Sequence, residues 1–163
     1  MMTRVSIETV ETTVREVSGW LARLAEIVAP PVLRIALAVP FFKSGLTKWD
    51  GFLSLSPAAE FLFEDEFKLH ILGQAYDFAF AYLDGIAEIV LPILLVVGLA
   101  TRFSALALLV MTGVIQLVVP EGWANFHLPW AGLALAIIAL GPGTFSVDHL
   151  LERLPRPWKQ GGA

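Results

Sequence analysis

Residues 82–100 read YLDGIAEIVLPILLVVGLA, an apolar stretch long enough to cross a lipid bilayer that nevertheless contains Asp84 and Glu88. A helix rises about 1.5 Å per residue, so about 20 residues cross a hydrocarbon core of about 30 Å. An ionised side chain at the centre of that core costs about 2.5–3.5 kcal/mol. Residues four apart share a helix face, so we expect both carboxylates to face other protein rather than lipid. The stretch predicts a bundle of membrane helices with a polar interior.

The rest of the chain has the composition of a membrane protein. Of its 163 residues, 56% are hydrophobic and 16% are charged, against about 45–50% and about 25% in soluble domains. Further apolar blocks predict a span that ends near residue 45 and spans over 103–119 and 129–140, beside one over 78–99. We therefore expect an all-α, polytopic membrane protein, a four-transmembrane-helix bundle with short interfacial helices, since helices satisfy their own backbone groups in lipid.

Three parts are expected along the chain. Residues 1–20 show apolar residues at spacings of four and three, which predicts an interfacial N-terminal helix, with a partner-binding helix as the alternative. Residues 21–151 form the four-helix membrane domain, and residues 152–163 form a cytoplasmic tail. The domain includes a long external connection at about 47–77, in which Ser56 followed by proline predicts the start of a short helix. After the fourth span, Ser146 is expected to cap another short helix.

Basic residues predict the orientation. Seven lie on the side that holds both termini, against three on the other, and an excess of Lys and Arg is typical of the cytoplasmic side. The seven are Arg4, Arg15, Arg23, Arg102, Arg153, Arg156 and Lys159, and the three are Lys43, Lys48 and Lys68. We therefore expect both termini in the cytoplasm.

Composition also excludes several kinds of chemistry. The chain contains no cysteine, so it has no disulfide, thiol redox group or thiolate metal site of its own. A net charge of −4 provides no basic surface for nucleic acid. No spacing is typical of a haem, flavin or iron–sulfur site, so we predict no catalytic residue and no resident cofactor. Whether the chain is an enzyme is left open, and a non-catalytic role is favoured.

Two basic residues of the first span are the candidate partners of the carboxylates. Counting helical rise from the ends of the two spans places Arg34 level with Glu88 and Lys43 level with Asp84. This predicts a deeper Arg34–Glu88 ion pair and a shallower Lys43–Asp84 pair. The pairs can simply hold the spans in register, or they can line a pocket that opens to the outer face. Both interpretations stay open.

The candidate pocket combines charged, polar and aromatic residues from the outer half of the bundle. Its predicted lining residues are Arg34, Lys43, Asp84, Glu88, Gln116, Trp123, His127 and Trp130. For His127, a role as an interfacial anchor beside the two tryptophans is an equally good interpretation.

A metal site is the less favoured idea for the external connection. Glu64, Glu66 and His70 lie close together in sequence, and the last two have the four-residue spacing that a helix could use. A solvated acidic patch is the favoured interpretation, so no metal is predicted.

Three segments of the chain resemble the DoxX family of small four-span bacterial membrane proteins. They are LRIALAVPFFKSGLTKW (33–49), AEIVLPILLVVGLATRFSALALLV (87–110) and FHLPWAGLALAIIALGPGTFSVDHLL (126–151). The positions that carry the resemblance are Arg34, Gly45, Lys48, Glu88, Arg102, His127 and an exit motif made of Gly141, Gly143, Ser146 and Asp148. The resemblance implies a four-helix bundle in the bacterial inner (plasma) membrane, without a settled activity.

Two functions follow as expectations. The first is an accessory membrane protein that binds a partner protein, or a small hydrophobic or metal-linked ligand, at the outer pocket in redox or metal stress. The alternative is a quinone-interacting membrane subunit of an oxidoreductase, with Arg34, Glu88 or His127 managing protons. The expected partners are the lipid bilayer and a membrane or periplasmic protein. An oligomer is also allowed, because small residues in the fourth span permit close helix packing.

Overall fold

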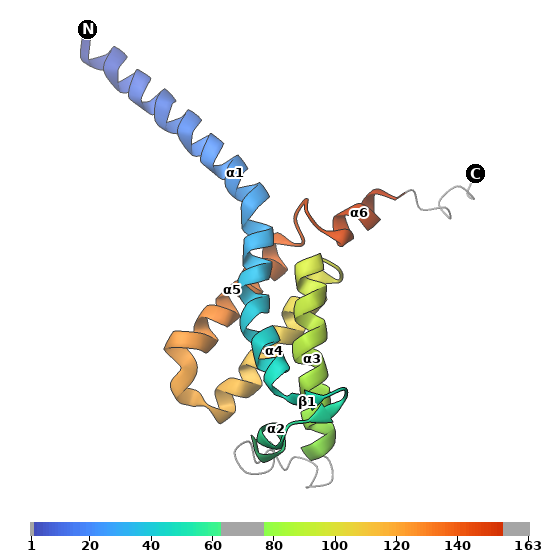
Figure 1. The fold of residues 1–163 in the computed structure, drawn as a ribbon. Helices are drawn as coiled ribbons and strands as arrows, with labels where there is room; N and C mark the ends of the chain where they lie inside the picture. Colours follow the sequence, from blue (N-terminus) through green and yellow to red (C-terminus); the bar gives the residue numbers. More distant parts are fainter. Residues whose placement is uncertain (1, 63–76, 155–163) are drawn as a thin grey trace, which may run out of the picture.

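The computed structural model describes residues 2–62 and 77–154, and its main feature is a bundle of four long helices (Figure 1). These are α1 (Met2–Thr47), α3 (Asp77–Val97), α4 (Thr101–Val118) and α5 (Leu128–Leu140). The described residues contain four segments with the length and composition to cross a membrane, namely Thr9–Thr47, Ala79–Val97, Thr101–Val118 and Pro120–Leu140. The predicted all-α membrane bundle is confirmed.

The four helices enclose one apolar core. Helices α1 and α4 each pack against both α3 and α5, so every helix buries one face and leaves the opposite face exposed. The core consists of Leu37, Ala38, Phe41, Leu95, Ala105, Leu108, Ala134 and Ile137. Large apolar side chains also cover the outside of the spans, as expected of helices whose outer faces meet acyl chains.

Short elements cluster at one end of the bundle, which we call the hairpin end. There α1 is followed by β1 (Trp49–Gly51) and β2 (Ser54–Leu55), which pair antiparallel, and then by α2 (Pro57–Phe61). A 3-10 turn, η3 (Pro120–Gly122), and a π-helical turn, η4 (Trp123–His127), join α4 to α5 at the same end. The opposite end carries α6 (Val147–Arg153), and we call it the α6 end.

Helix α1 is a single element. The helix expected over 1–20 is not separate from the first span, because α1 continues through Pro30, Pro31 and Pro40 to Thr47. Figure 1 shows its N-terminal part projecting away from the bundle at the α6 end.

Two predicted helix starts are confirmed. The Ser56 hydroxyl accepts a hydrogen bond from the backbone N–H of Ala59 at 3.2 Å, and Ser146 caps α6 by accepting from His149 N–H at 3.1 Å. The β-hairpin was not predicted. In its turn, the backbone of Leu53 has a φ of 56°, a value that residues other than glycine rarely adopt.

Some predictions fall outside the described residues. These are the apolar helical side of the external connection beyond residue 62, the metal candidates Glu64, Glu66 and His70, and the tail beyond residue 154.

Candidate ligand pocket

Two glycines let the hairpin end of α1 approach α3 closely. A Cβ on Gly45 would stand 3.0 Å from both the carbonyl carbon and the Cβ of Glu88, and a Cβ on Gly85 would stand 2.8 Å from the Trp49 ring. Residues at these positions can therefore carry no side chain without displacing a neighbour. The close approach places Lys48, one turn beyond Gly45, directly over α3.

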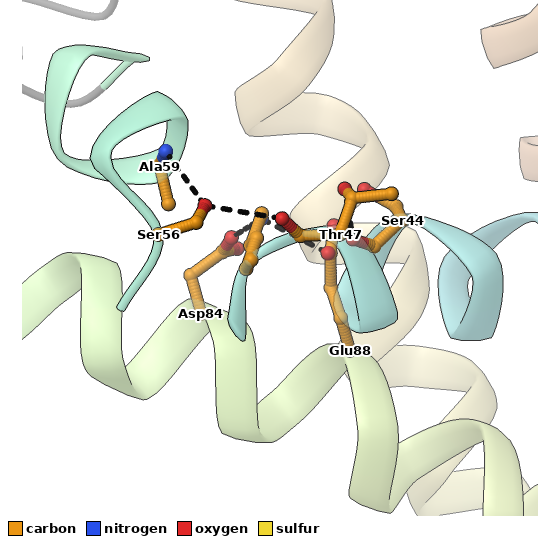
Figure 2. Close-up of polar contacts among 7 residues, drawn as sticks. Ser44, Thr47, Ser56, Ala59, Asp84 and Glu88 are labelled. Carbon is orange, nitrogen blue, oxygen red and sulfur yellow. Dashed lines mark hydrogen bonds and ion pairs between the residues drawn. The ribbon is translucent and has the colours of Figure 1, made fainter. Parts of the chain in front are cut away.

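Lys48 is the shared cationic partner of Asp84 and Glu88. Its ammonium group forms an ion pair with Asp84 and a second, at 2.9 Å, with Oε2 of Glu88. Lys48 is 6% exposed and Glu88 is 2% exposed, so water does little to screen this group. Figure 2 shows Asp84 and Glu88 projecting from α3 toward the end of α1. We call Lys48, Asp84 and Glu88 the polar cluster.

The charges of the polar cluster do not balance. Among the described residues, two carboxylates face one ammonium group, so these three side chains, when fully ionised, carry one negative charge in a largely buried place. Burying an uncompensated charge is costly. A proton, a cationic group or a hydrogen-bond donor on a ligand would therefore be stabilised here.

Hydrogen bonds hold the end of α1 in place beside the polar cluster. The Ser56 hydroxyl donates to the carbonyl of Thr47 at 3.1 Å (Figure 2). The N–H of Ser56 donates to the carbonyl of Lys48 at 2.9 Å. The Tyr82 hydroxyl of α3 donates to the carbonyl of Leu53 in the hairpin turn. The hairpin and the start of α2 thus act as a clamp that joins α1 to α3.

The rings of Phe41 on α1 and Trp130 on α5, which we call the aromatic wall, lie near the polar cluster. The ring of Trp130 lies 5.2 Å from Phe41, 5.5 Å from His127 and 6.0 Å from Phe126, measured between ring centroids. These distances are typical of favourable aromatic pairs. Trp130 therefore has a fixed place at the start of α5.

His127 and Gln116 form a pair behind this wall. Nδ1 of His127 lies 2.6 Å from Oε1 of Gln116, and Nε2 of the same amide donates to the carbonyl of Pro120 at 3.3 Å. Because the amide nitrogen is used by Pro120, its oxygen faces the ring and Nδ1 of His127 is the donor. The ring is 3% exposed and lies against Gly122, where a Cβ would stand 2.6 Å from it.

A cavity of about 180 Å³ lies between the polar cluster and the aromatic wall. Its lining residues are Pro40, Phe41, Ser44, Lys48, Leu62, Asp84, Glu88, Ile115 and Trp130. Pockets for drug-sized ligands have volumes of about 300–1,000 Å³, so this smaller cavity suits a small molecule or the head group of a larger one. One end offers charge and the other offers apolar and aromatic surface.

The structure brings together only part of the predicted pocket. Asp84, Glu88 and Trp130 line the cavity, whereas Gln116 and His127 pair beside Trp130 without lining it. Trp123 is 46% exposed and does not line the cavity.

The two predicted ion pairs are not those that the structure contains. Both carboxylates pair with Lys48, while Lys43 is exposed. Arg34 lies at the opposite end, because eleven residues of α1 separate it from Gly45, which is about 16 Å of helix. The prediction aligned the ends of the two spans, whereas α3 extends about two and a half turns past the end of α1.

Lys48 is the residue of the cavity lining that the span-end alignment missed. The available signal was the spacing Gly45-x-x-Lys48, in which a small residue marks a close helix approach one turn before a basic side chain.

Arg34 instead anchors the α6 end. It is 2% exposed, and its Nη2 donates to the carbonyl of Phe145 at 2.5 Å. Its guanidinium lies against Gly98, where a Cβ would stand 1.9 Å from Nη1. Gly98 has a φ of 76°, a conformation that suits glycine. Arg34 therefore joins the first span to the turn after the second and to the exit segment.

Asp148 completes this second contact network. Its carboxylate accepts hydrogen bonds from the N–H groups of Ala100 and Thr101 at 2.8 Å each, so α6 caps the start of α4. Burial raises the pKa of Asp148, but hydrogen bonds from Thr101 and Ala100 and the charge of Arg34 outweigh it, so the pKa lies below its ordinary value. Nε of Arg102 donates to the carbonyl of Ile138 at 3.1 Å, which ties α4 to the end of α5.

The fold and its two polar networks define a small polytopic helical membrane protein with a polar cavity at one end. Residues 29–121 match the DoxX family, and the chain belongs to that family. The chain is similar to a protein of Haemophilus influenzae described as an uncharacterized protein, with 30% identity over 138 residues that cover 76% of this chain and 83% of that protein. No solved structure matches the chain.

Proposed function

We propose that this protein is an accessory protein of the bacterial inner membrane, without catalysis of its own, that binds a small, partly hydrophobic ligand in the cavity at the hairpin end. The observation that carries the proposal is the juxtaposition of a buried polar cluster and an aromatic wall across one cavity of about 180 Å³. A role in redox or metal stress is an inference from the family resemblance.

The chemistry of the cavity narrows the ligand. The ammonium of Lys48 can donate to a carbonyl or anionic oxygen, while Asp84 and Glu88 can accept from hydroxyl or cationic groups. Phe41 and Trp130 offer ring surface to an apolar or flat part. A molecule with a polar head and an apolar body fits this arrangement better than a bare ion. Binding of a cationic or hydrogen-donating head group would also compensate the excess negative charge of the polar cluster.

A quinone is the second candidate, and the aromatic wall favours it. A quinone ring can stack on Trp130 while its carbonyl oxygens accept from Lys48. After reduction, its hydroxyl groups can donate to Asp84 or Glu88. Electrons would come from a partner oxidoreductase, which fits an auxiliary subunit. The cavity is too small for the isoprenoid tail of a quinone as well, so the tail would extend between the helices or into lipid.

The proposal places the cavity on the periplasmic side. An even number of spans puts both termini on one side, and Figure 1 shows the N-terminus and α6 at the same end of the bundle. That end holds Arg15, Arg23, Arg102 and Arg153, which favours the cytoplasm for it. A membrane or periplasmic partner protein would then reach the hairpin end.

The test is to purify the full-length protein in native nanodiscs and identify co-purifying small molecules by solvent extraction and mass spectrometry. We expect the wild type to retain a compound, and Lys48→Met to retain roughly tenfold less, since it loses the cation of the cluster. Lys43→Met is the matched control. Because Lys43 is exposed, this variant should retain as much compound as the wild type.

A cavity-filling variant separates ligand binding from stability. Ser44→Leu keeps all three residues of the polar cluster, although it removes the Ser44 hydrogen bond to Glu88, and it occupies the space beside them. It should lose the compound while still folding. Equal retention by wild type, Lys48→Met and Ser44→Leu would rule out this cavity as the ligand site. Identification of the compound as a quinone would select the second candidate.

A further inference from the structure

The N-terminal half of α1 carries an apolar seam that the bundle does not cover. Its six described members are between 45% and 62% exposed. They are Val10, Val14, Val17, Leu21, Leu24 and Val28. The steps between them alternate between four and three residues, which is the a and d pattern of a heptad repeat. In the sequence, Ile7 continues the pattern one step earlier, so the seam covers about three heptads.

This seam, apart from Val28 at the boundary, lies outside the hydrocarbon part of the membrane. The other spans contain 19, 18 and 21 residues, whereas the segment Thr9–Thr47 contains 39. Among the residues of α1 whose burial is described, Pro30 is the first that is buried, and a Cβ on Gly143 would stand 2.5 Å from it. Residues 28–47 alone cover about 30 Å, the full thickness of the hydrocarbon core. Residues 9–27 therefore extend beyond it, where acyl chains do not cover the seam.

A membrane surface is a poor cover for this segment. The segment continues from the span within the same helix, α1, and Figure 1 shows it projecting away from the bundle at a slant rather than lying across its end. Helices that bind anionic membrane surfaces are rich in Lys and Arg on the polar face. Here residues 9–27 contain two arginines against three glutamates. The charge therefore disfavours the lipid surface.

A second copy of the same helix fits the seam. The g positions, Thr13, Trp20 and Ile27, are uncharged, and among the described e positions only Glu11 is charged. The remaining charges of residues 9–27 lie on positions that face away from the seam. Two copies can therefore meet along the seam without like charges opposing each other across it.

We propose that the N-terminal half of α1 pairs with that of a second copy as a parallel, in-register coiled coil. Copies inserted the same way in one bilayer are necessarily parallel, and membrane tethering raises their effective concentration. The result is a dimer held together outside the membrane, with one cavity in each copy. This proposal does not depend on what the cavity binds.

Cysteine cross-linking tests the proposal directly, because the natural chain contains no cysteine. Val17→Cys and Leu21→Cys place a thiol on the seam, and Gly19→Cys and Glu26→Cys place one on the opposite side. Each full-length variant is oxidised in native membranes, and disulfide-linked dimer is measured over time. We expect dimer to form roughly tenfold faster at residues 17 and 21 than at residues 19 and 26.

A second change in the seam distinguishes pairing from chance collision. Val14→Asp puts a charge at an a position and should abolish cross-linking through Leu21→Cys, while Gly19→Asp should leave it unchanged. Equal cross-linking at all four positions would overturn the proposal, and so would the absence of dimer at residues 17 and 21. A fluorophore on Val17→Cys that is quenched by spin-labelled lipid, without cross-linking, would assign the seam to the membrane surface instead.

Discussion

Gly45 of α1 lies directly against Glu88 of α3, so that a Cβ at residue 45 would stand 3.0 Å from both the carbonyl carbon and the Cβ of that glutamate. This contact sets the register between the first two spans. It brings Lys48 to the carboxylates and leaves Arg34 for the other end of the bundle. The polar cluster therefore depends on a residue that has no side chain.

Replacing this glycine should weaken the bundle. Gly45→Leu forces α1 away from α3, and overpacking of this kind costs about 1–3 kcal/mol. The midpoint of thermal unfolding, followed by tryptophan fluorescence in detergent micelles, should fall. Gly113→Leu on α4 is the control, because a Cβ there meets no heavy atom within 4 Å. Equal melting midpoints for the two variants would refute the close contact.

Removing the shared cation should destabilise the protein more than removing a neighbouring one. Lys48→Met leaves the buried Glu88 and the half-buried Asp84 without their shared cation, and breaking a buried ion pair costs about 3–5 kcal/mol. Lys43→Met, at an exposed position, should change stability by less than about 0.5 kcal/mol. Denaturant or thermal unfolding measures both.

A compensating change checks that charge is the cause. Adding Glu88→Gln and Asp84→Asn to Lys48→Met removes both orphaned charges and should restore most of the lost stability. If the triple variant is as unstable as Lys48→Met alone, packing rather than charge explains the loss.

The cap that Asp148 supplies to α4 should depend on pH. Its pKa is lowered in the folded protein, so its contribution is present above the unfolded-state pKa of about 3.9 and is lost as pH falls through the folded-state value. Asp148→Asn replaces an oxygen acceptor with an amide and should cost about 0.5–2 kcal/mol at neutral pH. The gap between wild type and variant should close below about pH 4.

Glu152→Gln is the matched control for this experiment. Glu152 is an exposed acidic residue on the same short helix, α6. Its replacement should leave the melting midpoint close to the wild-type value at each pH. A gap for Asp148→Asn that stays constant down to acidic pH would contradict the cap as an ionised group.

The support of the aromatic wall can be tested at Gln116. Gln116→Leu leaves Nδ1–H of the buried His127 without its acceptor, which costs about 1–3 kcal/mol. Because the ring lies beside Trp130, tryptophan emission should shift as well. Gln116→Glu keeps an acceptor oxygen and should be closer to wild type. If Leu and Glu have the same effect, the hydrogen bond is not what holds the ring.

Much of the fold follows from local features of the sequence. Each span is long and apolar enough to be recognised within a window of about 20 residues. The caps at Ser56 and Ser146 need only a few residues around them, and both are present. Asp84 and Glu88 of α3, the second span, were also correctly expected to face protein, because ionised carboxylates are costly to place in lipid.

The partners of those carboxylates were decided by tertiary structure. Nothing local in either span states how far one helix slides past the other, and aligning the span ends gave the wrong register. The first turns of α3 instead pack beside the hairpin and α2, where Ala81 joins Leu55 and Ala59 in a small apolar cluster. The hairpin depends on pairing between short segments, so span-by-span patterns did not predict it.

The amino-acid sequence by itself thus determined that this protein is a four-span helical bundle with acidic residues inside. The hydropathy of a span and the free-energy cost of placing its charges in lipid can both be judged from that span alone. Only the folded bundle decided that Lys48 meets those acids, that Arg34 holds the opposite end, and that a cavity remains beside Trp130. These three features depend on where two helices can approach each other closely. The closeness of approach is set by the packing of both helix surfaces and cannot be read from either helix alone.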